Sequence, residues 1–479
     1  MSPALVFSSL LFLFRFLPAA LIVYYLTPRR FRNLALLVIS LIFYCWGEVR
    51  YLPLMVASTL VDFGCGQGIK HFGEKKRVRR LFLLLSMIFN LGSLLFFKYT
   101  GFILSNIEAL THIPMPDFSL PLPLGISFYT FQTMSYTIDV YRGDVTPEDN
   151  FINFAAYVTL FPQLIAGPIV RYSDVAAELK SRTITLPMIE KGASLFILGL
   201  GSKVLIANNV GSLWDSTAAL SLSDISTPMA WIAALAYSLQ IYFDFSGYSL
   251  MAIGLGQMLG FTFPQNFNYP YISGSVTEFW RRWHMTLSGW FREYVYFPLG
   301  GSRCSAAKRT RNLLIVWGLT GLWHGANWNF LLWGLWFFIL LIIEKNGLLD
   351  WLNRHKIVAH ILIPPILMIS WVIFATSDFS RLGGFLGKMF GIGGAVNPAN
   401  PFDWLYALRG YGVSLLIGVV MSLPTIKAAH EKLSLRVNGR PKAALALKTG
   451  ETVLLGVTLI LSVAYLVDST YNPFIYWNF

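Results

Sequence analysis

Charged residues are scarce in this chain. They make up 13% of its 479 residues, against roughly 25% in an average soluble protein, whereas hydrophobic residues make up 55%. No polar stretch is long enough for an independent soluble domain, and there is no internal repeat or low-complexity tract. The sequence therefore excludes a soluble globular protein and a repeat array, and it predicts a single membrane-embedded domain over residues 1–479.

Cysteine is also rare. The three cysteines, Cys45, Cys65 and Cys304, lie far apart and have no ligand-like spacing, which argues against a disulfide framework and against a zinc site. Met1–Ser9 contains no basic residue, so a cleavable signal peptide is not expected. The apolar segment Val6–Leu26 is long enough to remain as the first membrane helix.

Long apolar runs are abundant, and most approach the roughly 20 residues that a helix needs to cross a bilayer core of about 30 Å. We expect an all-α polytopic protein with about eleven transmembrane helices. Four prolines between Pro114 and Pro123 predict a non-helical or re-entrant segment before Gly125. The apolar runs are Val6–Leu26, Leu34–Trp46, Tyr51–Ile69, Leu81–Phe97, Leu122–Val140, Ile152–Ile169, Ala193–Ala207, Trp231–Gly260, Phe330–Ile343, Ile357–Ala375, Val413–Leu423 and Val453–Val467.

The net charge of +13 lies in the connections between the apolar runs. By the positive-inside rule the basic connections face the cytoplasm, which places the N-terminus on the extracytoplasmic side. Anionic lipid headgroups explain the excess charge better than a nucleic acid does, so no nucleic-acid partner is expected. The basic clusters are Arg29–Arg32, Lys70–Arg80, Arg171–Lys191, Arg303–Arg311 and Lys427–Lys448.

The segment Ser275–Arg311 is too polar for a lipid-facing helix and too aromatic for a plain loop. Its aromatic residues interleave with Arg281, Arg282 and Arg292, a pattern typical of amphipathic helices that lie at the lipid headgroups or dip inwards. Arg281, Arg282 and Trp283 are candidates for binding an anionic substrate. Anchoring in the membrane interface is at least as good an interpretation of these three residues.

Two histidines in this region are the leading catalytic candidates. His284 ends the motif FWRRWH and His324 lies in WHGANW, and burial in an apolar setting tunes an imidazole near neutrality. Trp323 precedes His324, and we expect His324 to begin a helix, which would place Asn327 and Trp328 on its face. A structural histidine bonded to a carbonyl is the alternative, and two histidines in one aromatic cluster weaken it. The other five histidines are expected to be solvated.

Six charged residues fall within or beside apolar runs, where an ionisable group is a functional candidate by default. Asp244 is the most suggestive, because the hydroxyls and glycine of IYFDFSGYS, Ile241–Ser249, could satisfy a carboxylate in a cavity. An ion pair with a lysine or arginine is an equally good interpretation of Asp244. For Arg15 and Glu344, a position from which the charged group reaches the membrane interface explains the charge without a functional role. The remaining three are Asp62, Asp139 and Lys203.

Other familiar site motifs are missing. The glycines of Gly64–Gly68 do not follow a strand, so a phosphate-binding loop is not supported and close helix packing is expected instead. No Ser-His-Asp order, no G-x-S-x-G elbow and no metal-ligand cluster is visible, so no metal is predicted.

Two long motifs resemble the membrane-bound O-acyltransferase family, and within it the alginate O-acetylation branch. They are FNYPYISGSVTEFWRRWHMTLSGWFREYVYFPLGGSR, Phe267–Arg303, and GLTGLWHGANWNFLLWGLW, Gly318–Trp336. The core of the resemblance is therefore residues 267–336. Further similar segments are Pro123–Gly143, Phe161–Tyr172, Gln240–Ser249 and the terminal Asn472–Phe479.

The resemblance implies a bundle of about eleven transmembrane helices with re-entrant and interfacial pieces around a central funnel. It implies that a thioester donor, acetyl-coenzyme A or a charged acyl carrier, approaches from the cytoplasm. The acyl group then passes to an extracytoplasmic hydroxyl, on a polysaccharide or on a protein that relays acetyl groups to it. No tightly bound cofactor is implied, and the expected location is a bacterial cytoplasmic membrane.

The family's characteristic histidine falls at His324, expected to act as general base, and its second polar position falls at His284, expected to orient the donor or share the proton path. Asn327 would stabilise the oxyanion, and the two arginines before His284 would attract the phosphates of the donor. Two departures from the alginate-type pattern, Leu250 and Glu293 in place of aspartates, leave the acceptor open. D-alanyl-type transfer from a carrier protein, and a transporter or polysaccharide-export channel, are the alternative functions.

Overall fold

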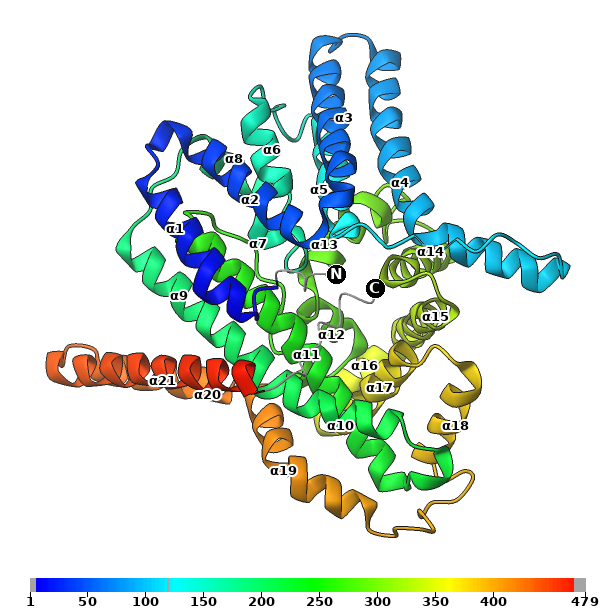
Figure 1. The fold of residues 1–479 in the computed structure, drawn as a ribbon. Helices are drawn as coiled ribbons and strands as arrows, with labels where there is room; N and C mark the ends of the chain where they lie inside the picture. Colours follow the sequence, from blue (N-terminus) through cyan, green and yellow to red (C-terminus); the bar gives the residue numbers. More distant parts are fainter. Residues whose placement is uncertain (1–5, 119, 469–479) are drawn as a thin grey trace. The chain divides into compact units, whose positions relative to one another are not determined.

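The computed structural model describes residues 6–118 and 120–468, and these residues form helices and connecting segments without a β-strand (Figure 1). The all-α prediction is confirmed. The chain divides into two compact units, which we describe separately. Unit 1 comprises the described part of Met1–Phe196 together with Ser249–Pro264, and unit 2 comprises Ile197–Tyr248 together with the described part of Gln265–Phe479. The terminal segment Asn472–Phe479 lies outside the described residues.

Seven helical segments within the described residues are long and apolar enough to cross a membrane, and a shorter apolar helix covers Phe12–Leu26. The chain is therefore a multi-pass membrane protein, as its composition predicts. The total of about eleven spanning helices stays a prediction. The seven segments are Arg29–His71, Lys76–Thr111, Leu186–Ala218, Trp328–Arg354, Lys356–Ala375, Asp403–Met421 and Pro441–Asp468.

Unit 1 contains the helices α1 to α8, and α3 lies beside α4 in it (Figure 1). Gly66 and Gly68 permit close packing there. A Cβ on Gly66 would come within 2.7 Å of the Tyr136 hydroxyl, and one on Gly68 within 2.6 Å of the Phe82 ring, which confirms the packing role expected for these glycines. The helices are α1 (Leu17–Leu26), α2 (Arg32–Glu48), α3 (Leu52–His71), α4 (Lys76–Thr111), α5 (Ile126–Arg142), α6 (Phe151–Thr159), α7 (Phe161–Leu164) and α8 (Tyr172–Lys180).

The apolar run Ile152–Ile169 is not one spanning helix. It forms α6 and the single turn α7, and the backbone leaves the helical region between them at Leu160, where φ is −51° and ψ is 109°. Pro162 follows in the first turn of α7, where a residue without an N–H is tolerated, but it could not continue α6. The prediction of a continuous helix here is wrong because hydrophobicity alone does not show this break.

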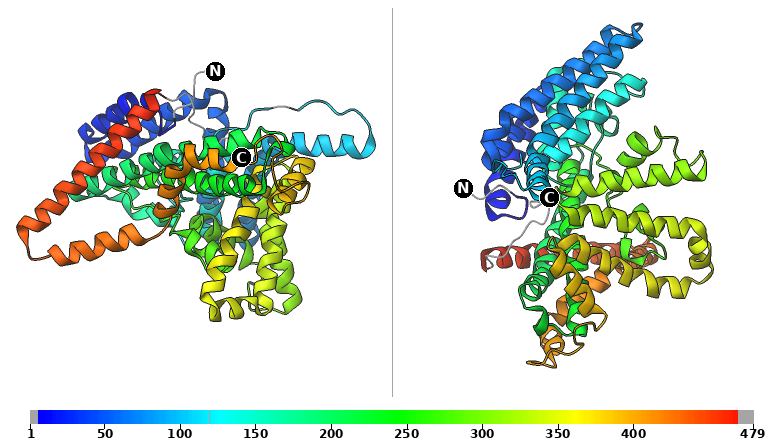
Figure 2. Two further views of the ribbon diagram at one scale, coloured as in Figure 1. Left: turned by 90° about the horizontal axis from the view of Figure 1, so that it is seen from below. Right: turned by 90° about the vertical axis from the view of Figure 1, so that its right-hand side faces the viewer.

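Unit 2 is built around buried aromatic side chains, among them Phe279, Trp333, Phe337 and Trp371. Two helices, α9 (Leu186–Gly201) and α11 (Thr227–Met258), contribute residues to both units. Figure 2 shows α20 and α21 as a helical hairpin. The helices of unit 2 are α10 (Asn208–Ala218), α12 (Val276–Arg282), α13 (Met285–Phe291), α14 (Ala306–His324), α15 (Trp328–Ile343), α16 (Leu349–Arg354), α17 (Lys356–Ala375), α18 (Phe379–Met389), α19 (Asp403–Met421), α20 (Thr425–Val437) and α21 (Pro441–Asp468).

A buried carboxylate links three helices of unit 1. Asp62 of α3 is fully buried, and its carboxylate accepts hydrogen bonds from Ser86 Oγ, from Thr137 Oγ1 at 3.1 Å and from Asn90 Nδ2 at 2.8 Å. The side-chain oxygen of Asn90, Oδ1, in turn accepts a hydrogen bond from Ser58 Oγ at 3.0 Å. Because hydroxyl and amide donors satisfy this carboxylate within the helix bundle, Asp62 acts as a structural link between α3, α4 and α5.

Removing this acceptor should destabilise the bundle. Asp62→Ala leaves three buried donors without a carboxylate, and each unsatisfied group costs about 1–3 kcal/mol, so we expect a clearly lower thermal unfolding midpoint in detergent. Asp62→Asn keeps one acceptor oxygen and should have a smaller effect. Asp117→Ala, at an exposed aspartate, is the matched control. Equal midpoints for Asp62→Ala and this control would show that the network contributes nothing.

Candidate active site

The helices α14 and α15 form a close pair that carries His324. Gly321 and Gly334 lie where the two helices touch, and neither position has room for a side chain. A Cβ on Gly321 would overlap the carbonyl of Phe330, and one on Gly334 would overlap the carbonyl of Trp317. The two glycines therefore set the short distance between the backbones and hold His324, at the end of α14, against the start of α15.

His324 is the last residue of α14. Gly325 after it is extended, and Asn327 is the N-cap of α15, which begins at Trp328. The prediction that His324 begins a helix and shares a face with Asn327 and Trp328 is therefore wrong, because the chain leaves the helix before those positions. Trp328 is 51% exposed, whereas His324 is 4% exposed.

Three aromatic rings surround the imidazole of His324. The ring centroids of Trp323, Trp333 and Phe374 lie 5.0, 5.0 and 5.2 Å from its own, all in edge-to-face arrangements. These rings come from α14, α15 and α17, so three helices fix the position of one imidazole. Such geometry suits aromatic quadrupoles and restricts the motion of the ring.

His284 is fully buried and has an unusual backbone. It lies between α12 and α13 with φ 41° and ψ 54°, in the left-handed region that residues with a Cβ avoid. Such a conformation costs about 1–3 kcal/mol and persists only where the surrounding contacts enforce it. His284 thus lies where the short helices α12 and α13 meet, and its imidazole is buried within unit 2.

The hydrogen bonds of Asn266 fix the tautomer of His284. The backbone N–H of Thr286 donates to Asn266 Oδ1 at 3.3 Å, so that atom is the acceptor oxygen of the amide. His284 Nδ1 lies 3.0 Å from the same oxygen and must therefore carry the proton. Nε2 then bears a lone pair, and it is buried without a hydrogen-bond partner among the described residues. His284 lies outside the seven candidate spans, and burial lowers the pKa of its imidazole to about 3, which keeps the ring neutral.

Trp323 connects the two histidines. Its ring centroid lies 5.0 Å from that of His324 and 5.9 Å from that of His284. Phe245 contacts the other side of the His284 site, at 4.7 Å between centroids. The fold therefore brings two imidazoles that are 40 positions apart in the sequence (324 minus 284) into contact with one indole.

The tryptophans of the FWRRWH motif lie in the core of unit 2. Trp280 is 8% exposed and Trp283 is 3% exposed, and Trp283 packs at 4.7 Å against Trp371. Trp290 and Tyr294 are also buried. Interfacial anchoring was one interpretation of Trp280 and Trp283, and it is wrong because both side chains pack against aromatic side chains of other helices in unit 2.

The two arginines of this motif differ in their surroundings. Arg282 forms an ion pair with Glu278, with Nη2 and Oε1 2.9 Å apart, and its Nη1 donates to the carbonyl of Asn268 at 3.1 Å. Its guanidinium is thus engaged within the protein. Arg281 is exposed and forms no ion pair with a described residue. Of the two, Arg281 is the arginine whose charge remains accessible to an anionic ligand.

Asp244 belongs to a buried ion pair. Its Oδ1 lies 2.5 Å from Lys203 Nζ, and the two side chains are 1% and 2% exposed. Gly247, one turn further along α11, allows the close approach, since a Cβ there would come within 2.7 Å of the Gly199 carbonyl. Pairing with a lysine was one of the two interpretations of Asp244, and the structure shows this pairing. The five remaining histidines are all exposed, as predicted: His71, His112, His355, His360 and His430.

Glu344 has a structural role beside the candidate site that the sequence did not reveal. It was expected at an interface, but its side chain is 2% exposed. Its carboxylate accepts hydrogen bonds from the backbone N–H of Val276 at 2.5 Å, from that of Thr277 at 2.8 Å and from the Thr277 hydroxyl at 2.6 Å. Glu344 thereby fixes the start of α12, the helix that leads to His284. No local pattern joins residues 67 to 68 positions apart.

The described residues contain no group of three or more His, Cys, Asp or Glu side chains that could hold a metal ion. Cys45, Cys65 and Cys304 are free thiols.

A comparison with known proteins identifies one family and several relatives of this chain. Residues 141–377 match the membrane-bound O-acyltransferase family, MBOAT. The chain is 44% identical over 394 residues to a probable alginate O-acetylase of Pseudomonas syringae pv. tomato, covering 81% of this chain and 76% of the relative. It is 39% identical over 500 residues to a probable alginate O-acetylase of Pseudomonas putida, covering 99% and 100%. It is 36% identical over 428 residues to a peptidoglycan O-acetyltransferase of Helicobacter pylori, covering 81% and 80%.

Shortening the side chain of Glu344 should loosen α12 selectively. In Glu344→Ala the two backbone amides and the hydroxyl lose their acceptor, at about 1–3 kcal/mol for each buried unsatisfied group. We expect faster hydrogen exchange in Val276–Arg282 and unchanged exchange in α14, with a smaller effect in Glu344→Gln. Asp350→Asn, at an exposed acidic residue of α16, is the control. A uniform increase across both helices would show general destabilisation and contradict a positioning role.

Proposed function

This chain belongs to the membrane-bound O-acyltransferase family and is an O-acyltransferase; we propose that it moves an acetyl group from a cytoplasmic thioester to an extracytoplasmic hydroxyl. The donor would be acetyl-coenzyme A, and no tightly bound cofactor is needed. The protein would lie in a bacterial cytoplasmic membrane with its N-terminus outside, which puts the basic connection Arg29–Arg32 in the cytoplasm.

The observation that carries the proposal is that two buried imidazoles, those of His284 and His324, both contact the ring of Trp323. In the proposed reaction His324 removes the proton from the acceptor hydroxyl, and the oxygen attacks the thioester carbonyl carbon. The tetrahedral intermediate then expels the thiolate as the carbon–sulfur bond breaks, and the imidazolium returns the proton to the sulfur. The apolar rings around His324 disfavour a charged imidazole at rest, which suits a base that must begin neutral.

His284 would assist through its Nε2 lone pair. Because Asn266 accepts the Nδ1 proton, Nε2 can only accept a hydrogen bond or a proton. A substrate hydroxyl would supply the donor that this buried atom otherwise lacks among the described residues. His284 would thus orient a substrate hydroxyl or share the proton path with His324.

Groups at the start of α15 would stabilise the oxyanion. Asn327 is half-buried at the N-cap, and its side chain makes no capping hydrogen bond. Its amide and the positive end of the helix dipole of α15 would favour a developing negative charge. Trp323 and Trp328 would border the acyl group on either side of the first turn of α15.

The donor and the acceptor would be held by different features. The exposed guanidinium of Arg281 would attract the phosphates of the donor, whereas Arg282, already paired with Glu278, would hold the helix in shape. The relatives act on alginate and peptidoglycan according to their names, so we propose an extracytoplasmic polysaccharide as the acceptor, reached directly or through a protein that relays acetyl groups.

Replacing His324 tests the proposed base. His324→Ala should lower acetyl transfer by about 10²–10⁴-fold, the usual contribution of a positioned general base, while the protein still inserts in the membrane. The measurement is the acetyl content of the exported polymer by mass spectrometry, with export quantified in parallel. His360→Ala, at an exposed histidine, is the matched control. Loss of export with unchanged acetyl content per polymer unit would instead favour a transporter.

An assay with the purified protein identifies the acyl donor. We expect the protein to consume acetyl-coenzyme A in the presence of an acceptor and to leave a D-alanyl carrier protein unchanged, as measured by release of free thiol. Arg281→Gln should raise the KM for acetyl-coenzyme A with little change in kcat, because the side chain would bind donor phosphates outside the reacting atoms. Consumption of the charged carrier alone would replace acetyl transfer by D-alanyl transfer.

A further inference from the structure

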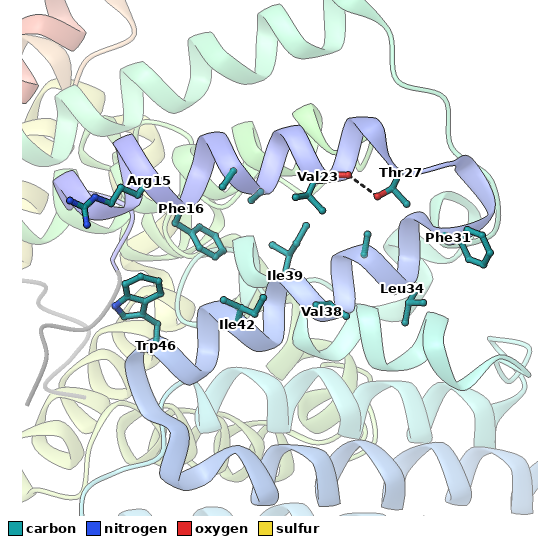
Figure 3. A pocket seen from close by; sticks show the side chains of 13 residues that line it. Arg15, Phe16, Val23, Thr27, Phe31, Leu34, Val38, Ile39, Ile42 and Trp46 are labelled. Carbon is teal, nitrogen blue, oxygen red and sulfur yellow. Dashed lines mark hydrogen bonds between the residues drawn. The ribbon is translucent and has the colours of Figure 1, made fainter.

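Unit 1 contains an apolar groove that the proposed reaction does not use. It lies between α1, with the π-helical turn Phe12–Phe16 that precedes it, and α2, and its volume is about 480 Å³ (Figure 3). This volume is within the range of about 300–1,000 Å³ that small-molecule sites occupy. The lining residues are Arg15, Phe16, Ala19, Ala20, Val23, Thr27, Phe31, Leu34, Ala35, Val38, Ile39, Ile42 and Trp46.

The groove has one polar end. Arg15 and Trp46 lie together at this end, and Thr27 and Phe31 lie at the other (Figure 3). The hydroxyl of Thr27 donates to the Val23 carbonyl at 2.7 Å, so it offers no donor to a ligand. The guanidinium of Arg15 is thus the group in the lining that can bind an anion.

Arg15 has no ion-pair partner in the part of the chain that the structure describes. It is exposed. It lies in an apolar helix of a membrane protein, where an uncompensated guanidinium is costly and normally finds a partner or reaches the headgroups. Trp46 beside it is 43% exposed, as is typical of a tryptophan at the membrane interface.

The dimensions of the groove match a lipid tail. The twelve positions from Arg15 to Thr27 extend along the helix for about 18 Å at 1.5 Å per residue. One hydrocarbon leaflet is about 15 Å deep, half of a core of about 30 Å. A chain whose phosphate contacts Arg15 would therefore run along the whole apolar lining.

We propose that this groove is a binding site for an anionic phospholipid, with the phosphate on the Arg15 guanidinium and one acyl chain between α1 and α2. The charge of Arg15 selects the headgroup, and the apolar side chains hold the tail. Ala19, Ala20 and Ala35 provide the width, because a methyl side chain leaves space for the chain between the helices.

The test uses the full-length protein in detergent, incubated with phosphatidylglycerol or with phosphatidylcholine of the same acyl chains. Native mass spectrometry measures the lipid that stays bound. We expect preferential retention of phosphatidylglycerol, and an affinity about fivefold lower in Arg15→Gln, since one basic residue near a headgroup contributes on the order of 1 kcal/mol. Arg50→Gln, an exposed arginine outside the groove lining, is the control and should bind as the wild type does.

A second variant tests the groove itself. Ala35→Phe should fill the space and reduce retention of both lipids, while thermal unfolding shows whether the protein remains folded. Equal retention of the two lipids by the wild type, or an equal loss in Arg15→Gln and Arg50→Gln, would overturn the site. So would a dimer that disappears in Ala35→Phe, because the occupant would then be a second copy of the chain.

Discussion

The contact of one indole with two imidazoles is the interaction on which the candidate active site depends. Trp323 and His324 are neighbours at the end of α14, so whatever fixes that helix end fixes both rings. The glycine contacts at Gly321 and Gly334 determine how closely α14 approaches α15. A side chain at either glycine would displace the helix end and separate Trp323 from His284. The geometry of the candidate site is therefore set by two residues that carry no functional side chain.

The imidazole of His284 is held in place by contacts that outweigh the conformational preference of its own backbone. The left-handed conformation of His284 costs on the order of 1–2 kcal/mol. Asn266 offsets part of this cost through its bond to Nδ1, and Glu344 holds the start of the preceding short helix. A relaxed backbone would turn the ring away from Trp323. The strain and the hydrogen bonds thus act together to keep a bare Nε2 lone pair beside the indole.

Much of this structure was predictable from local sequence. Composition indicates a polytopic helical protein, and the glycines Gly66 and Gly68 indicate close packing, because both signals lie in adjacent residues. The motifs around His284 and His324 also identify the candidate site. The end of α14 at His324 was not predictable from spacing, since one extended glycine, Gly325, changes which residues share a face. Long-range contacts such as that of Glu344 with α12 leave no local pattern at all, and burial of the motif tryptophans depends on partners in other helices.

The buried charges show by contrast why the imidazoles are the better candidates for chemistry. Asp62 accepts hydrogen bonds from hydroxyls and an amide, Asp244 pairs with Lys203, and Glu344 caps α12. Each carboxylate is thus occupied in holding helices together, and protonating or moving it would break contacts that the fold needs. Nε2 of His284 makes no such structural hydrogen bond within the described residues. A buried acceptor atom without a hydrogen-bond partner among the described residues is what makes His284 a candidate for the substrate contact of the proposed reaction.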